Sequence, residues 1–519
     1  MPTTPPNSNQ PLLGSLHSNT TPIKKNLSNT SPYSSTLPRS NADSRYKNMA
    51  FDACEKFVGP ESVETFLSTF VPEAKEPRPP ITATLSVPAT SSMETKFVSI
   101  SPHVGSLLYL CSLQINRIEI SGFCPRLKFR DTTNRILDPQ RYNLKPDITI
   151  FSATDPDISL ESSSPPHWRA VDLWIENKNK GDDVFRKLDD MRKEAKEGQD
   201  LRSHIKWTKA AYAVSGQLIA YADAIHRSQF RVFSFSVVLF GNTGRLLRWD
   251  RSGIVYTAPF DWPEQHDTLY EFLWRINHLS YVDRGYDTTV TSVEGDVANA
   301  ALAKLITYPG LENVTKSDLY KFLVRDDHTS DGHVKYYVTA GAIWDSKSLF
   351  GRSTYGYIAY DMETTNLVYL KDFWRKDLPD IQKEGDVYRE LHRAGVSNIA
   401  RLGLAGDVPL SPDGGPGVVQ RTRAQDCMTG SGNGDDGCPG RPSVDPYVHY
   451  RLVLETLGKP LMTFKSTRQL CEVIRDAIVG THGLLTFPVF SILSYPSQLI
   501  WRRTTRLTSF IGMSAQEIS

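Results

Sequence analysis

The sequence predicts a mixed α/β protein, of the α+β or α/β class, with several domains. Its 519 residues exceed the usual length of one domain and suggest about two or three. Short runs rich in β-branched and aromatic residues alternate with stretches of helical periodicity, which is typical of mixed folds. Lys+Arg 59 and Asp+Glu 58 give a formal net charge of +1, so bulk charge neither favours nor excludes a nucleic-acid partner.

Composition divides the chain into segments. Residues 1–45 are rich in Ser, Thr, Asn and Pro, and we expect a disordered tail there. We expect a first α/β module over residues 46–290, opening with a helical segment over residues 51–70. A second module is expected over residues 316–485, with a flexible insertion rich in Gly, Pro, Asp and Ser over residues 406–445.

Cysteine spacing and hydropathy bear on the compartment. The six cysteines show no C-x-x-C spacing, which favours free thiols in a reducing compartment. The N-terminus lacks a basic stretch followed by an apolar core, and no run of about 18 apolar residues occurs. The sequence therefore predicts an intracellular protein, cytoplasmic or nuclear, without a membrane partner.

Two predicted strands of the first module carry charged residues at their ends. Pro146-Asp147 leads into one strand, and Glu176 and Lys178 close the strand predicted over residues 170–178. Residues i and i+2 of a strand share one face, so Glu176 and Lys178 point to the same side. Gln217 and Tyr221 lie four residues apart on a predicted helix, residues 208–227, and also share a face.

The order Asp147, Glu176-x-Lys178, Gln217-x-x-x-Tyr221 resembles the restriction-endonuclease-like superfamily, and its RecB-like branch in particular. The resemblance implies that Asp147 and Glu176 hold Mg²⁺, with Lys178 orienting the attacking water or stabilising charge on phosphate. An inactive scaffold of that fold and a chance match of short patterns remain alternatives. A nucleic-acid partner is expected only under the nuclease hypothesis.

The second module contains a strand–turn–strand–helix pattern over residues 349–391. Gly351, Ser353, Gly356 and Ile358 fit G-x-G-x-x-G-x-V, with serine at the middle glycine and isoleucine at the valine. Backbone N–H groups of such a turn fold over phosphates.

A lysine and a glutamate follow this turn. Lys371 ends the run Val368-Tyr369-Leu370-Lys371, which fits the V-A-I-K strand, and Glu384 lies in the helix that follows. Val387, Tyr388 and Leu391 lie three, four and seven residues after Glu384, which predicts a helix with one face in the core.

These motifs resemble the small lobe of a protein kinase, and more narrowly the fungal-type protein kinase family, over residues 174–485. The resemblance implies that ATP and Mg²⁺ are bound for phosphorylation of protein Ser/Thr. Lys371 would meet the α- and β-phosphates and pair with Glu384, and the backbone near Glu455 would meet adenine. The motif Trp249-Asp250-Arg251-Ser252-Gly253 also matches this family, and we interpret Asp250 and Arg251 as a structural ion pair.

The resemblance ends after a helix predicted over residues 466–482. The sequence contains no H-R-D tripeptide and no D-F-G, so the catalytic-loop aspartate and a metal-binding aspartate are missing, and the large lobe is incomplete. Residues 486–519 resemble translated intron or frame-shifted sequence, which suggests mis-splicing. We expect no kinase turnover from these residues. The alternatives are a truncated pseudokinase acting as a nucleotide-binding or interaction module, and a Mg²⁺-dependent nuclease in the first module.

Overall fold

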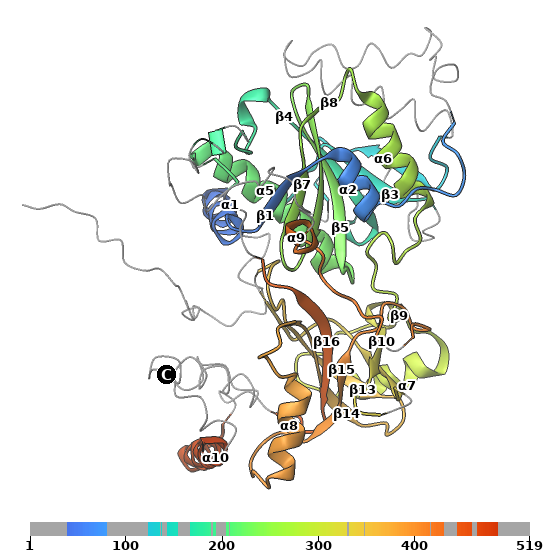
Figure 1. The fold of residues 1–519 in the computed structure, drawn as a ribbon. Helices are drawn as coiled ribbons and strands as arrows, with labels where there is room; N and C mark the ends of the chain where they lie inside the picture. Colours follow the sequence, from blue (N-terminus) through green and yellow to red (C-terminus); the bar gives the residue numbers. More distant parts are fainter. Residues whose placement is uncertain are drawn as a thin grey trace, which may run out of the picture. The chain divides into compact units, whose positions relative to one another are not determined.

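The computed structural model describes most of the chain (Figure 1). Its residues fall into two compact units. The larger unit comprises the described residues up to 390 together with residues 401–457, and the smaller comprises residues 391–400 and those from 458 onward. The described residues are 39–79, 123–134, 136–137, 143–153, 167–187, 190–191, 193, 204–206, 208–329, 332–346, 348–415, 417–429, 444–458 and 464–485.

The first sheet of the larger unit has the strand order β1-β7-β6-β5-β4-β3-β2, with β8 paired to β6. Strands β2, β3 and β4 form an antiparallel meander, and β4 then pairs in parallel with β5. The bounds are β1 Phe57–Glu61, β2 Leu127–Asp131, β3 Ile148–Ser152, β4 Val171–Lys178, β5 Phe233–Phe240, β6 Thr243–Asp250, β7 Ile254–Thr257 and β8 Phe260–Asp261.

Helices cover both faces of this sheet. α2 (Val63–Phe70) and α6 (His266–His278) share one buried cluster with the strands, whereas α5 (Lys209–Ser228) and the end of α1 (Arg39–Ala53) share the other. α5 is the crossover between β4 and β5, and its first turn is capped by the Thr208 side chain, which accepts a hydrogen bond from Ala211 N at 3.1 Å. α1 approaches α5 so closely that a Cβ at Gly216 would lie 2.0 Å from the Tyr46 carbonyl oxygen.

The helical segment expected over residues 51–70 is confirmed for the end of α1 and for α2, but the prediction is wrong between them, where strand β1 interrupts the helix. Phe57 and Val58 are adjacent and both buried, but they belong to the clusters on opposite faces of the sheet. Only a strand places consecutive side chains on opposite faces. Helix α1 also begins at Arg39, inside the segment expected to be a tail, while residues 1–38 lie outside the described part.

The second sheet of the larger unit is antiparallel throughout, with the order β15-β16-β14-β13-β11-β10-β9 and β12 paired to β13. α7 (Gly295–Leu305) packs on one face, and α8 (Glu384–Arg393) follows β14. The bounds are β9 Val290–Ser292, β10 Tyr320–Arg325, β11 Val334–Thr339, β12 Trp344–Asp345, β13 Tyr355–Asp361, β14 Leu367–Lys376, β15 Leu402–Asp407 and β16 Tyr447–Leu454.

Part of the insertion expected to be flexible is paired with ordered strands. Pro409 forms an isolated bridge with Val419, and Arg421 forms one with Val448 of β16. α9 (Asp426–Thr429) follows, and residues 430–443 lie outside the described part. Short 3-10 turns complete the larger unit: η1 Trp168–Ala170, η2 Lys180–Asp182 and η3 Lys316–Asp318.

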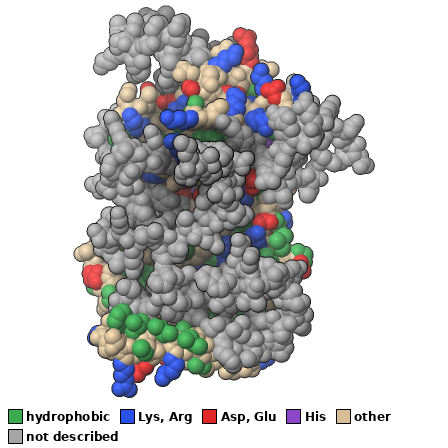
Figure 2. All heavy atoms as spheres, turned by 90° about the vertical axis from the view of Figure 1, so that its left-hand side faces the viewer, with side chains coloured by type: hydrophobic (Ala, Val, Ile, Leu, Met, Phe, Trp, Pro, Cys, Tyr) green, Lys and Arg blue, Asp and Glu red, His purple; other side chains and the backbone are tan. Residues whose placement is uncertain are grey.

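The smaller unit contains α10 (Thr467–Leu485), which agrees with the helix predicted over residues 466–482. One side of α10 is apolar and exposed, and Figure 2 shows it as a strip of hydrophobic side chains; its exposed members are Val473, Ile474, Ile478 and Val479. Among the described helices, none combines the length and hydropathy needed to cross a bilayer. Residues 486–519, where a mis-spliced tail was expected, lie outside the described part.

Candidate functional sites

The structure brings Lys371 and Glu384 together on one face of the second sheet. Lys371 extends from β14, and its Nζ lies 2.7 Å from Glu384 Oε1. Glu384 is the first residue of α8, where the helix dipole favours a carboxylate. Both side chains are largely buried, with 13% and 5% of their surface exposed, so the pair is shielded from solvent screening.

Arg352 is a second cation on the same carboxylate. Its Nη2 donates to Glu384 Oε2 at 3.0 Å, and its guanidinium lies over the Phe373 ring. Burial lowers the pKa of Lys371 below its ordinary value, the Glu384 carboxylate opposes that shift, and Arg352 adds to it. The result is a buried carboxylate held between two cations, one from β14 and one from the turn that precedes β13.

Two residues of the glycine-rich turn have a positive φ. Ser353, which replaces the middle glycine, has φ +35°, and Gly351 has φ +81°. A non-glycine residue in this region carries strain, which clusters at functional sites. At Gly356 the reason for glycine is packing, since a Cβ there would lie 2.3 Å from the Tyr369 hydroxyl.

Helix α7 covers the sheet surface between Lys371 and the end of β16. Tyr369 pairs in register with Leu454 at the end of β16 and with Ile358 of β13, so all three lie beside the predicted path from Lys371 to Glu455. Ile358, Tyr369 and Leu457 pack in one cluster with three buried residues of α7: Ala298, Ala301 and Leu305. The Glu455 backbone N–H donates to Arg401 O at 2.9 Å.

The five residues of the nuclease-like pattern also lie together, on the first sheet. Asp147 N donates to Glu176 Oε2 at 3.2 Å, and Asn177 N donates to Asp147 Oδ2 at 2.7 Å. Lys178 Nζ lies 2.6 Å from Glu176 Oε1. Two carboxylates beside a lysine thus meet where β3 begins and β4 ends.

Helix α5 supplies the other two members of this cluster. Gln217 Nε2 donates to Glu176 Oε1 at 3.2 Å and to Tyr221 Oη at 2.7 Å, and Tyr221 Oη donates to the Lys145 carbonyl at 2.8 Å. Burial, followed by the charge of Asp147, raises the pKa of Glu176 to about 7. Burial also raises the pKa of Asp147, so the two acids disfavour full ionisation together.

Comparison with known proteins decides the family. The family model described as fungal protein kinase matches residues 171–487, which is more than half of the chain. The chain belongs to the fungal protein kinase family. No curated protein and no solved structure matches the chain.

The match to the fungal protein kinase family includes all of the Lys371 site but only part of the nuclease-like site. Lys371 and Glu384 lie well inside it, and Glu176 lies inside it, whereas Asp147 precedes Val171, where it begins. Neither Lys371 nor Glu176 lines the cavity of about 50 Å³ or the cavity of about 610 Å³ in the described part of the chain. The larger cavity, of about 610 Å³, is lined by Tyr286, Val293 and the start of α7.

The interpretation of Asp250 and Arg251 as an ion pair is wrong. Asp250 Oδ2 is 2.5 Å from Arg248 Nη1, and Asp250 Oδ1 accepts hydrogen bonds from the backbone N–H groups of Ser252 and Gly253. Residues 248 and 250 share a face of β6, while residue 251 follows the end of the strand. Arg251 instead donates from Nη1 to the Leu349 carbonyl at 3.0 Å.

Sequence reasoning missed a buried charge network on the other face of the second sheet. Asp372 is hydrogen-bonded to His449, and Arg451 Nε lies 3.3 Å from Asp372 Oδ2. Arg451 also bridges to Asp287, whose Oδ2 lies 2.5 Å from its Nη2. Asp372 directly follows Lys371, and its charge inside an apolar strand was the one signal that could have revealed the network.

Proposed function

We propose that this protein binds ATP with Mg²⁺ at the Lys371–Glu384 pair, as the small lobe of a protein kinase does. The buried 2.7 Å contact between these residues carries the proposal. The residues fit the phosphate end of a nucleotide, because Glu384 fixes a lysine beside the strained turn of Gly351 and Ser353. ATP supplies the phosphoryl group that protein kinases transfer.

Nucleotide entry at this site requires helix α7 to move. A nucleotide reaching from Lys371 to the backbone near Glu455 lies over Tyr369 and Ile358, and α7 packs against both in the closed arrangement. We propose that α7 acts as a cover, held by Ala298 and Ala301, that opens when nucleotide binds. The free energy of opening then reduces the observed affinity.

We propose nucleotide binding without phosphoryl transfer for these 519 residues by themselves. Protein kinases need a catalytic-loop aspartate as base and further metal-binding residues, and the sequence contains no H-R-D and no D-F-G. Losing such groups removes the positioning and charge stabilisation that make up most of the rate enhancement. The expected role is a pseudokinase-like module that binds a protein partner.

Calorimetric titration of ATP·Mg²⁺ into the full chain tests the nucleotide site. The variant Lys371→Met should weaken binding roughly 10- to 100-fold, because one charged hydrogen bond is worth about 1.5–3 kcal/mol. Lys335→Met is the matched control, since Lys335 lies on the same sheet in an exposed pair with Glu363. Equal affinity of Lys371→Met and wild type would overturn the proposal.

A pair of α7 variants tests the cover. Ala301 is fully buried against the sheet, so Ala301→Asp should detach α7 and raise the affinity for ATP. Val297→Asp changes the same helix at an exposed position and should leave the affinity unchanged. If neither wild type nor Ala301→Asp binds ATP, the site is not a nucleotide site.

We propose as a second candidate that the first module is a Mg²⁺-dependent nuclease. The meeting of Asp147, Glu176 and Lys178 with Gln217 and Tyr221 supports it, because residues from the start of β3, the end of β4 and helix α5 converge at one end of these strands. Two carboxylates are a donor set that suits Mg²⁺ shared with a phosphate. Lys178 would orient water or stabilise charge developing on phosphate, and Gln217 would hold the Glu176 carboxylate.

Cleavage of single- and double-stranded DNA with Mg²⁺ or with EDTA tests this candidate. Cleavage should require Mg²⁺ and disappear in Glu176→Ala, while Glu264→Ala, an exposed carboxylate of the same module, should behave as wild type. Cleavage that survives Glu176→Ala, or an inactive wild type, would leave the cluster as a structural feature only.

A further inference from the structure

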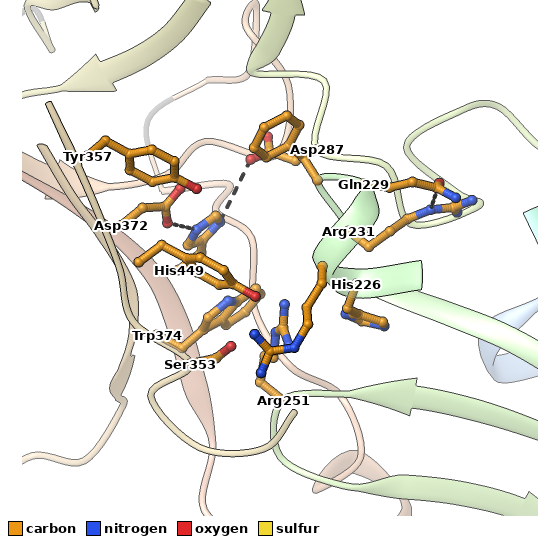
Figure 3. A pocket seen from close by; sticks show the side chains of 13 residues that line it. His226, Gln229, Arg231, Arg251, Asp287, Ser353, Tyr357, Asp372, Trp374 and His449 are labelled. Atoms are coloured by element: carbon orange, nitrogen blue, oxygen red, sulfur yellow. Dashed lines mark hydrogen bonds and ion pairs between the residues drawn. The ribbon is translucent and has the colours of Figure 1, made fainter. Parts of the chain in front are cut away.

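A small polar cavity of about 50 Å³ lies where residues of the two sheets of the larger unit meet (Figure 3). At about 10–15 Å³ per water it has room for roughly three to five waters, the size range of one small inorganic anion. Its lining includes Arg251, Ser353, His226, Asp287 and Asp372. It lies on the face of β14 opposite to Lys371, because Asp372 and Lys371 are consecutive strand residues.

Arg251 projects into this cavity as a buried charge without an ion pair (Figure 3). Its exposure is 4%, no carboxylate of the described residues lies within ion-pair distance, and its Nε has no hydrogen-bond partner among them. Burial lowers the pKa of its guanidinium. A buried, unpaired cation is costly, so this position favours a counter-ion.

The neighbouring arginines differ from Arg251 because each has a carboxylate of its own. Arg227 makes hydrogen bonds of 2.8 and 2.9 Å with Asp223 and is also paired with Asp345. Arg231 lies 3.2 Å from Asp172. Among the guanidinium groups that line the cavity, Arg251 alone therefore makes no ion pair within 4 Å in the described residues.

The carboxylates that line the cavity are engaged elsewhere. Asp372 is bound by His449 and Arg451, and these partners hold its pKa at about 2 although burial opposes them. Asp287 is bound by Arg451 and by Gln420, whose Nε2 donates at 2.6 Å. Neither carboxylate is within 4 Å of an Arg251 nitrogen, so Arg251 is left for another anion.

Two further polar side chains line the same cavity. Ser353 is 3% exposed, and its Oγ has no hydrogen-bond partner among the described residues. His226 is 4% exposed; its Nε2 meets Ser234 Oγ at 3.1 Å, and its Nδ1 has no such partner. Three residues that line the cavity thus carry a buried polar atom without a hydrogen-bond partner among the described residues: the Ser353 hydroxyl, Arg251 Nε and His226 Nδ1.

We propose that this cavity binds a small inorganic anion, chloride or inorganic phosphate, through Arg251 and Ser353. The anion compensates the guanidinium and accepts hydrogen bonds from Arg251 Nε and Ser353 Oγ. It also fixes the turn of the second sheet, since Gly351 N donates to the Arg251 carbonyl at 2.7 Å and Arg251 Nη1 holds Leu349. Arg352, on the same turn, contacts Glu384, so the anion also stabilises the position of the Lys371–Glu384 pair.

Urea unfolding of the full chain tests the site at constant ionic strength, with gluconate replaced stepwise by chloride in one series and by phosphate in another. The wild-type midpoint should rise saturably with at least one of the two anions. At 100 times the dissociation constant, the folding equilibrium constant should be about 100-fold larger than without anion. The series that saturates identifies the anion.

Two variants test whether the anion-dependent rise of the unfolding midpoint comes from this cavity. Arg251→Gln should show no anion-dependent rise and should be more stable than wild type in gluconate, because the unpaired charge is gone. Arg393→Gln replaces an exposed arginine at the end of α8, away from the cavity lining, and should keep the full wild-type rise. An equal rise in Arg251→Gln, or no rise in wild type with either anion, would overturn the proposal.

Ser353→Ala keeps the test decisive if Arg251→Gln does not fold. It removes one donor and leaves the charge, so the anion concentration at half-saturation should increase about tenfold. An unchanged half-saturation would show that the anion does not bind at Ser353. These readouts contain no nucleotide, so their failure is independent of any failure of ATP binding.

Discussion

The buried pair of Lys371 and Glu384 makes an asymmetric prediction for stability. Removing one partner of a buried ion pair costs about 3–5 kcal/mol, because the other charge stays buried without compensation. Lys371→Met leaves Glu384 with Arg352 at 3.0 Å, and Arg352 is 47% exposed, so it replaces only part of the lost interaction. We therefore expect Lys371→Met to lower the free energy of unfolding by about 2–3 kcal/mol.

Glu384→Gln should cost less than Lys371→Met. It leaves Lys371 buried, but burial already lowers the pKa of this lysine, so it can lose its proton more readily than an exposed one. About 1–2 kcal/mol is expected. The double variant should be no less stable than Lys371→Met, which gives a coupling energy of about 1 kcal/mol or more.

Urea unfolding at pH 7 measures all four proteins of this cycle. Lys335→Met supplies the scale for an exposed pair, since Lys335 and Glu363 are 24% and 51% exposed and such pairs contribute about 0.2–1 kcal/mol. If Lys371→Met loses no more stability than Lys335→Met, or if the two site variants add without coupling, the reasoning is refuted.

Three further predictions concern other parts of the molecule. The pKa of Glu176 is raised from 4.5 to about 7. Its contribution to the free energy of unfolding, about 3 kcal/mol, is therefore present below pH 4.5 and lost by pH 7. Unfolding curves recorded over this pH range should show the loss in wild type and not in Glu176→Gln. Asp372 has its pKa lowered from 3.8 to about 2, so about 2 kcal/mol present above pH 3.8 should vanish as the pH falls to 2, and Asp372→Asn should lack this acid sensitivity. Gly356→Ala places a methyl group against the Tyr369 hydroxyl and should cost about 1–2 kcal/mol in thermal unfolding, of which Tyr369→Phe in the same chain should restore most; no restoration would contradict the packing account.

Local spacing made the two candidate sites predictable. The pattern Glu176-x-Lys178 fixes two side chains on one strand face, and Gln217 and Tyr221 fix two on one helix face, so the sequence already limits how they can meet. Likewise a lysine at a strand end followed by a helix with an early glutamate predicts the pairing of Lys371 with Glu384.

Contacts between residues distant in sequence could not be predicted from local residue spacing. The cover formed by α7 depends on Ala298 and Ala301 meeting Tyr369, and nothing local to α7 indicates which sheet face it packs on. The partner of Asp250 was predictable in hindsight, because Arg248 lies two residues away on the same strand face. The isolation of Arg251 was not, since it depends on every carboxylate nearby being engaged by residues distant in sequence.

Labelling with an acyl-phosphate derivative of ATP tests the central claim most directly. Such a reagent transfers its acyl group to a lysine amine that lies beside the nucleotide phosphates, and peptide mass spectrometry identifies the modified residue. The account predicts that Lys371 is labelled, that excess ATP·Mg²⁺ prevents the labelling, and that Ala301→Asp increases it. Labelling of other lysines that ATP does not suppress, with Lys371 unmodified in both wild type and Ala301→Asp, would contradict the account.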